Sequence, residues 1–227
     1  MSRVRQKPAS RGSQKWLQLL VNRAPHLALP LGLSMSDKIT WLSPLADDDH
    51  AEYRDEEFLA RVQARPTRTP LSDFWPTPGP QWDALGRTSR GELLLVEAKA
   101  HIPELLSGSS RATGRSLRLI RTSLDRVKRA VGSRAATDWC TMYDQYTNRL
   151  AHLYFLRTLN RIPAYLIFVY LYGDADMQGP ETAEAWAGAI RLAHAHLGID
   201  DARLHRAFGG AVVEIFVDVA DITVATT

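Results

Sequence analysis

Two acids and a lysine stand out in the sequence because their spacing could bring them together. Asp83 precedes Glu97 by fourteen residues, and Lys99 follows Glu97 by two. Glu97 ends a run of large apolar residues, 93–96, which is typical of a buried strand. Side chains alternate along a strand, so Glu97 and Lys99 share one face. Burying a carboxylate and an ammonium there is costly unless they bind an ion or take part in a reaction.

The turn before this strand sets which residues face each other. Residues 89–91, with the sequence Ser-Arg-Gly, have the composition of a three-residue hairpin loop with glycine in the left-handed position. This loop pairs Thr88 with Glu92, and the same register places Asp83 opposite Glu97, with Cβ atoms about 4.5–5.5 Å apart. Two carboxylates at that distance repel, and a cation between them relieves the repulsion. Oxygen ligands in a partial shell suit Mg²⁺ or Mn²⁺.

Asp83 followed by Glu97-Ala98-Lys99 resembles the motif of the PD-(D/E)xK nuclease superfamily. The resemblance implies a restriction-endonuclease-like fold with an αβββαβ core and metal-dependent hydrolysis of phosphodiester bonds in DNA or RNA. It gives Asp83 and Glu97 the places of metal ligands. The main-chain carbonyl of Ala98 takes the place of an additional ligand, and Lys99 that of the catalytic lysine. Trp82 stands where the family motif has proline, so one letter of the motif is missing.

Two other interpretations of these residues stay open. Glu97 and Lys99 could form a structural ion pair at the end of a strand, since an isolated E-x-K sequence is common on strand edges. Alternatively, the chain keeps a nuclease-like fold and binds nucleic acid or a protein partner without cutting it.

Acids upstream of the motif are further candidate metal ligands. Apolar residues between 58 and 62 predict a helix that ends near residue 65, just before a proline. We expect this helix to open the family core, and the resemblance implies that such a helix often contributes an acid to the site. Glu52 and Glu57 are the candidates. A solvated acidic helix start, stabilised by the helix dipole, is the more common explanation for each of them.

Several polar residues downstream are candidate substrate contacts. His101 follows Lys99 by two residues, so it shares the same face if the strand continues. Residues 111–134 hold eight basic residues against one acid, on the polar faces of a helix whose apolar stripe runs from 117 to 131. We expect this helix to lie beside the site and bind phosphate through Arg111, Arg115 and Arg118, although solvated charge is the ordinary explanation.

The next helix, predicted over residues 141–159, carries a second polar stripe. Gln145, Arg149 and His152 recur at spacings of four and three residues. Gln145 and Arg149 loosely resemble a glutamine and tyrosine that some branches of the superfamily place near the site. The stripe therefore contacts substrate or faces solvent.

The remaining pattern predicts an α/β domain with a mixed central sheet and helices on both faces. Residues 1–15 carry five basic residues and no acid, which favours a disordered tail. We expect one domain over 16–227, with its core at about 52–219. The predicted elements are helices at 12–22 and 180–197, strands at 164–172 and 210–219, a loop at 23–46, and a loop or broken edge strand at 66–80.

Composition limits the other function classes. A length of 227 residues is sufficient for one large domain with a sizeable core. Cys140 is the only cysteine, which excludes an intramolecular disulfide. No glycine fingerprint follows a strand, so we expect no nucleotide cofactor. The apolar run at 27–33 is too short to span a bilayer. The expected protein is cytoplasmic and has nucleic acid as its partner.

Overall fold

A five-stranded mixed sheet forms the centre of the computed structural model, which describes residues 2–25 and 38–226. The strand order is β2-β4-β5-β6-β7. The strands are β2 (Ile39–Ser43), β4 (Ala84–Thr88), β5 (Leu93–Lys99), β6 (Ala164–Tyr172) and β7 (Val212–Asp218). Strands β2, β4 and β5 are antiparallel neighbours, whereas β5, β6 and β7 run parallel. The predicted mixed sheet of an α/β domain is confirmed.

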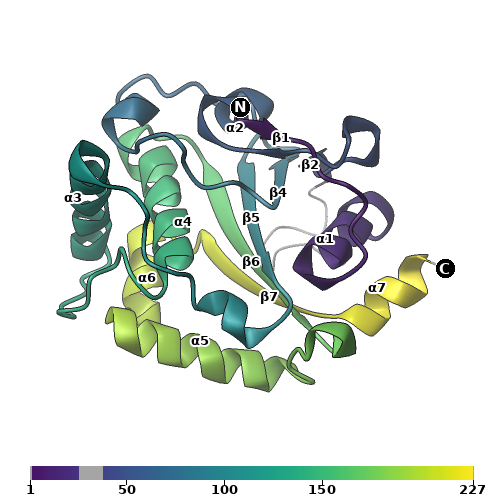
Figure 1. Cartoon of the computed structure of the whole chain (residues 1–227). Helices are drawn as coiled ribbons and strands as arrows, with labels where there is room; N and C mark the ends of the chain where they lie inside the picture. Colours follow the sequence, from purple (N-terminus) through teal and green to yellow (C-terminus); the bar gives the residue numbers. More distant parts are fainter. Residues whose placement is uncertain (1, 26–37, 227) are drawn as a thin grey trace.

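Helices cover both faces of this sheet, also as predicted (Figure 1). Two helices, α1 (Gly12–Arg23) and α7 (Val219–Thr226), pack on one face. The other face is covered by α4 (Asp144–Tyr154), which continues as a π-helical turn at Phe155–Leu159, and by α5 (Ala183–Leu197) and α6 (Asp201–Phe208). A further helix, α3 (Gly114–Ala130), packs on α4. In Figure 1, α3 lies on the far side of α4 from the sheet.

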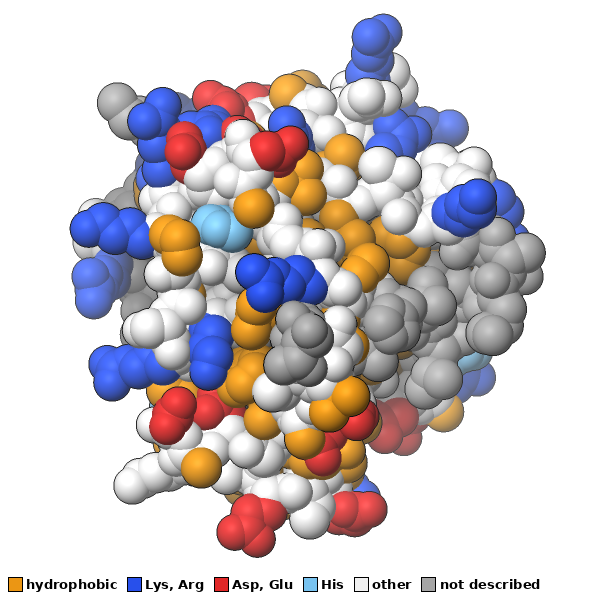
Figure 2. Space-filling model, turned by 90° about the vertical axis from the view of Figure 1, so that its right-hand side faces the viewer, with side chains coloured by type: hydrophobic (Ala, Val, Ile, Leu, Met, Phe, Trp, Pro, Cys, Tyr) orange, Lys and Arg blue, Asp and Glu red, His pale blue; other side chains and the backbone are white. Residues whose placement is uncertain are grey.

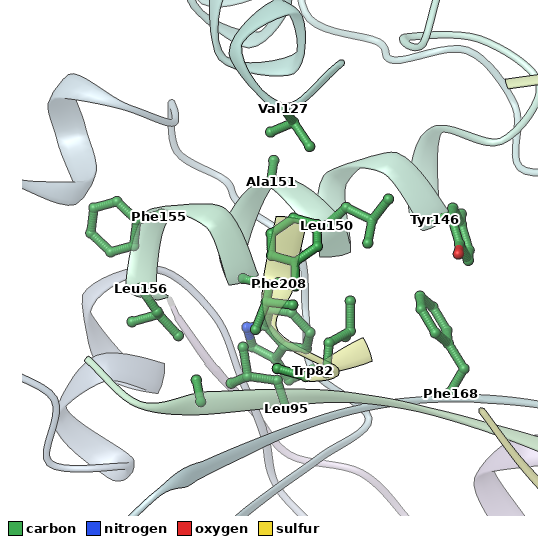
Figure 3. Packing of buried hydrophobic residues seen from close by; sticks show 14 of the residues in the cluster. Trp82, Leu95, Val127, Tyr146, Leu150, Ala151, Phe155, Leu156, Phe168 and Phe208 are labelled. Atoms are coloured by element: carbon green, nitrogen blue, oxygen red, sulfur yellow. The ribbon is translucent and has the colours of Figure 1, made fainter. Parts of the chain in front are cut away.

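Strand β5 is buried along its whole length and separates two hydrophobic clusters. Leu95 faces α4, whereas Leu94 and Val96 face α1. Leu150 of α4 belongs to the same buried cluster as Leu95, and in Figure 3 Ala151 of α4 points away from the sheet, toward Val127 of α3. Each fully buried apolar side chain of this size contributes about 1.5–3 kcal/mol to folding. The packing therefore fixes β5 and α4 relative to each other.

The core begins earlier in the chain than the sequence led us to expect. The order α1, β2, β4, β5, α4, β6 is helix, three strands, helix and strand, and it starts upstream of residue 52. Strand β2 lies in a segment expected to be a loop. The predicted helix near residues 58–62 exists as α2 (Asp55–Arg61), but it follows β2 and the short strand β3 (Glu52–Tyr53) and does not open the core.

The basic N-terminal segment is ordered rather than a disordered tail. Residues of β1 (Arg3–Val4) pair with β3 in a small antiparallel sheet. Arg3 forms an ion pair with Asp48 at 2.6 Å, so the basic segment is held by the acidic one at 46–49. The apolar run at 27–33 lies outside the described residues. Within residues 2–25 and 38–226, no helix is long and apolar enough to cross a membrane.

Candidate functional site

The hairpin between β4 and β5 has the register that the turn residues predict. Thr88 N–H donates to the Glu92 carbonyl at 2.9 Å, and Gly91 has a φ of +85°, in the left-handed region. Residues whose numbers add to 180 are paired along the ladder, as in Ala84 with Val96. Extending this register by one residue brings Asp83 opposite Glu97.

The ladder opens at the residue before Asp83. In an unbroken antiparallel ladder, the next hydrogen-bonded pair would join Trp82 to Ala98. Trp82 N–H instead donates to the Tyr53 carbonyl at 3.0 Å, and Asp83 Oδ2 accepts from Ala98 N–H at 2.8 Å. The N–H and C=O of one strand residue point to the same side. The Ala98 carbonyl therefore faces the side on which Asp83 lies.

Both carboxylate oxygens of Glu97 have cationic partners. Oε1 forms an ion pair with Lys99 Nζ, which also donates to Gln145 Oε1 at 2.8 Å. Oε2 accepts from Arg149 Nε at 2.6 Å and lies 2.5 Å from Arg149 Nη2. Burial by itself raises the pKa of Glu97, but the charges of Arg149 and Lys99 outweigh it and hold that pKa below its usual value. Glu97 is therefore a buried, ionised carboxylate.

Arg149 ties helix α4 to both strands. Besides Glu97 on β5, its guanidinium donates to the Gln81 carbonyl at 2.7 Å and to Asn148 Oδ1 at 2.9 Å. It also lies over the Trp82 ring, 4.8 Å from the ring centroid. A guanidinium group is planar and can donate to several acceptors in fixed directions at once, whereas the ammonium of lysine cannot. Arg149 thus sets the approach of the chain before Asp83 to the end of β5.

Asp83 and Glu52 add two more carboxyl groups next to Glu97. Burial, followed by the negative charge of Glu97, raises the pKa of Asp83 to about 8. Glu52 is buried and accepts hydrogen bonds from Gln14 at 3.1 Å, Gln6 at 3.2 Å and Gln81. Burial raises its pKa too, although the amide donors oppose the shift. Three carboxyl groups therefore lie close together in the free protein, and a bound cation would offset the repulsion between their negative charges.

These groups line a cavity of about 680 Å³ at the end of β5. Ser13 at the start of α1 forms part of the wall, as do Glu104 and Ser107 after β5 and Asp144 at the start of α4. Burial raises the pKa of Asp144 to about 6. The wall is largely polar, which suits a charged ligand better than an apolar one.

The donors fit Mg²⁺ or Mn²⁺ as a partial shell. Asp83, Glu97 and the Ala98 carbonyl provide hard oxygen atoms, and Mg²⁺ commonly takes its other ligands from water and substrate phosphate. Among the described residues, no three side chains of histidine, cysteine, aspartate or glutamate are grouped closely enough to hold a metal by themselves. Glu97 Oε2 is taken by Arg149, so a cation would share Oε1 by displacing Lys99.

The structure sorts the remaining candidate residues into two groups. Glu52, Gln145 and Arg149 line the cavity. The other candidates do not line it: Glu57, His101, Arg111, Arg115 and Arg118. Glu57 is exposed on α2 and borders a separate hollow, and His101 pairs with Glu104 Oε1 at 3.0 Å.

The three arginines are exposed and none of them lines the cavity. Arg115 and Arg118 belong to α3, which packs against α4, and Arg111 lies in the loop before it. Phosphate binding by these residues stays a prediction.

His152 departs from the expected stripe, since it faces neither substrate nor solvent. Its ring is buried among Phe58, Trp75 and Trp82.

Sequence reasoning missed several residues of the site. Asn148 lines the cavity and lies three residues after Gln145, on the same helix face. The helical spacing could therefore have identified it. Gln81 comes two residues before Asp83 and donates to Glu52. Gln14 of α1 has no such signal, because only the fold brings it to Glu52.

Comparisons with protein-family models, with curated proteins and with solved structures found no match for this chain.

Proposed function

We propose that this protein is a metal-dependent nuclease of the PD-(D/E)xK type that hydrolyses phosphodiester bonds in DNA or RNA. One juxtaposition carries the proposal: Asp83 and Glu97 lie opposite each other at an opened ladder end, with Lys99 on the same face in a polar cavity. The order of core elements supports it, since helix, three strands, helix and strand is the order that the resemblance implies.

Asp83, Glu97 and the Ala98 carbonyl would hold the cation. When bound, Mg²⁺ or Mn²⁺ supplies a Lewis acid at a phosphate oxygen and makes its bound water a better nucleophile. Arg149 keeps Glu97 in place through Oε2, so this carboxylate presents only Oε1 to the cavity. Two carboxyl groups held at a fixed spacing need little rearrangement to accept a ligand.

Lys99 is placed to act on the substrate once it no longer pairs with Glu97. Its hydrogen bond to Gln145 Oε1 holds the ammonium in the cavity when the ion pair opens. There the positive charge would stabilise the negative charge that develops on the phosphate oxygens. Gln145 is then the residue that keeps Lys99 in position.

Incubation with single-stranded and double-stranded DNA and RNA tests this function. The wild type should cut at least one substrate with Mg²⁺ or Mn²⁺, and Lys99→Ala should not. Mn²⁺ should also raise the melting temperature of the wild type, but not that of Glu97→Ala. No cleavage of any substrate together with no thermal shift would overturn the proposal.

A second candidate function is a nuclease-like domain that binds nucleic acid or a protein partner without cutting. The pairing of both Glu97 oxygens with Lys99 and Arg149 favours it, because the ion pairs satisfy the carboxylate with no cation present. Nucleic-acid binding that is unchanged by Mn²⁺, with no cleavage, would favour this function over the first.

We place the protein in the cytoplasm. Its one cysteine, Cys140, is a buried free thiol, which fits a reducing compartment. Subcellular fractionation of cells that express this chain with a tag, followed by blotting of each fraction, tests this location: the protein should be in the cytoplasmic fraction.

A further inference from the structure

Helix α3 is divided into an apolar face and a face of exposed arginines. Ile120, Leu124 and Val127 are buried in the main core cluster. The exposed arginines of the helix are Arg115, Arg118, Arg121, Arg126 and Arg129. Arginines three residues apart on a helix, such as Arg115 and Arg118, repel each other. A bound anion or the solvent must offset this repulsion.

The charge on this helix is unusual for the chain as a whole. Residues 111–134 contain eight basic residues and one acid, whereas the whole chain has a formal net charge of +3. The rest of the chain is therefore net negative. The side of the molecule that faces right in Figure 1 carries aspartate and glutamate side chains as well as lysine and arginine (Figure 2). Within α3, by contrast, six residues are basic and one is acidic.

Four of these arginines are available to a ligand. Arg121 is held by Asp138 at 2.9 Å, so it is excluded from the set. Among the described residues, no acidic side chain forms an ion pair with the other four. We call Arg115, Arg118, Arg126 and Arg129 the arginine stripe. Residues eleven apart on an α-helix return to nearly the same face after three turns, about 16 Å along the axis. Arg115 therefore aligns with Arg126, and Arg118 with Arg129.

We propose that the arginine stripe binds the phosphate backbone of a nucleic acid at a surface separate from the cavity. The identity of the polyanion rests on the proposed nuclease function. A guanidinium fork binds phosphate through two hydrogen bonds and stays charged at any working pH. The stripe from Arg115 to Arg129 extends over fourteen residue steps, or about 21 Å along the helix axis. Each strand of a B-form duplex has one phosphate per about 3.4 Å of helix axis, so the stripe spans about six phosphates.

The stripe and the cavity are built on different elements. Helix α3 packs on α4, and none of the four arginines lines the cavity. Phosphates bound at the stripe are therefore not the ones that react. The stripe adds affinity for long nucleic acids and leaves the chemistry at Asp83, Glu97 and Lys99 unchanged. A substrate too short to reach both places should gain nothing from it.

Binding in the absence of metal tests the stripe without relying on cleavage. Fluorescence anisotropy with labelled single-stranded and duplex DNA of about thirty nucleotides, in EDTA and in the Lys99→Ala background, measures Kd at several salt concentrations. Replacing all four stripe arginines by glutamine should raise Kd at least tenfold. It should also reduce the slope of log K against log salt by about 3, since each lost phosphate contact removes about 0.7–0.9.

A matched control carries the same loss of charge elsewhere. Arg23, Arg161, Arg191 and Arg206 are exposed and lie outside α3. Replacing these four by glutamine should change Kd by less than the stripe variant does. Equal effects of the two variants, or an unchanged Kd for the stripe variant, would overturn the proposal. Binding to polyglutamate but not to DNA or RNA would also overturn it, in favour of an acidic protein partner.

A fold check keeps the result interpretable. The melting temperature of the stripe variant should stay within about 4 °C of the wild type, because all four side chains are exposed. Replacement of the four by lysine keeps the charge, so it should retain most of the salt slope and melt normally. Failure of the proposed function would appear as no cleavage with the stripe effect intact. Failure of the stripe would appear as normal metal-dependent cleavage with no stripe effect.

Discussion

The carboxylate of Asp83 accepts a hydrogen bond from the main-chain N–H of Ala98 at 2.8 Å, in the position that the Trp82 carbonyl would occupy in an unbroken ladder. The same side chain is thus both a structural acceptor and a candidate metal ligand. Asparagine keeps an acceptor oxygen of the same shape, whereas alanine leaves the Ala98 N–H without its partner.

These two roles of Asp83 can be separated by substitution. The free energy of unfolding of Asp83→Asn should lie within about 1 kcal/mol of that of the wild type. For Asp83→Ala it should fall by about 1–3 kcal/mol, the cost of leaving a buried donor without an acceptor. Both variants should lose Mn²⁺ binding, because neither retains the carboxylate. Urea unfolding and calorimetric titration with Mn²⁺ measure the two effects. Mn²⁺ binding that survives in Asp83→Asn would remove Asp83 from the ligand set.

Lys99 competes with a cation for Glu97 Oε1. Lys99→Met removes the ammonium and keeps a side chain of similar length, so Oε1 becomes free while Arg149 still holds Oε2. We expect Mn²⁺ affinity to rise by roughly tenfold, equivalent to about 1.4 kcal/mol, and cleavage to be lost. Calorimetric titration and a cleavage assay on the same preparation check both. A fall in Mn²⁺ affinity would mean that Lys99 does not occupy the cation position.

Arg149 is the buried counter-charge of Glu97. Arg149→Met removes the cation from a buried pair and leaves the carboxylate partly uncompensated, which should lower the free energy of unfolding by about 3–5 kcal/mol. Arg149→Lys keeps the charge but loses the fork to the Gln81 carbonyl and to Asn148, so its loss should be smaller. Chemical denaturation gives both values.

Arg157 provides the comparison for this change. Its guanidinium donates to the Ala164 carbonyl at 3.0 Å, away from the cavity. Arg157→Met should therefore cost only about 0.5–1.5 kcal/mol, as for one ordinary hydrogen bond. Similar losses for Arg149→Met and Arg157→Met would show that the Glu97 pair contributes nothing special to stability.

His152 should make the fold sensitive to mild acid. Burial lowers the pKa of His152 to about 3, whereas an unfolded histidine has a pKa of about 6.5. The unfolded chain therefore binds the proton first, and stability falls as the pH drops from about 6.5 toward 3. Between pH 7 and pH 5 this single group should remove about 2 kcal/mol.

Replacement of His152 tests that contribution. His152→Leu should abolish this part of the pH dependence, whereas His205→Gln, a change at an exposed position on α6, should leave it in place. Urea unfolding at the two pH values gives the comparison. A wild-type protein that loses no more stability on acidification than His152→Leu would contradict the assignment.

The hairpin and the long strand were predictable because local signals decide them. The Ser-Arg-Gly loop fixes the register from Thr88 to Glu92, and alternation then determines the face of every residue on β5. Strand β6 occupies the predicted residues 164–172, because an apolar run of that length is buried on both faces. The proximity of Asp83, Glu97 and Lys99 follows from these two local facts.

What could not be predicted depends on long-range packing. Strand β2 is only five residues long and follows a segment rich in proline and leucine, so its own residues do not identify it as a strand. It is a strand because it pairs with β4, which lies more than forty residues later in the chain. The N-terminal segment is ordered by Asp48, more than forty residues away. The packing of α3 on α4 could not be predicted, because amphipathicity shows that one face is buried but not against which element.

A crystal structure of the protein grown with Mn²⁺, with anomalous data to locate the ion, tests the central claim most directly. We predict an anomalous peak between Asp83 and Glu97, within ligand distance of the Ala98 carbonyl, with Lys99 moved off Glu97 and still bonded to Gln145. A map with no peak there, and with the ion pair between Lys99 and Glu97 intact at saturating Mn²⁺, would contradict the account.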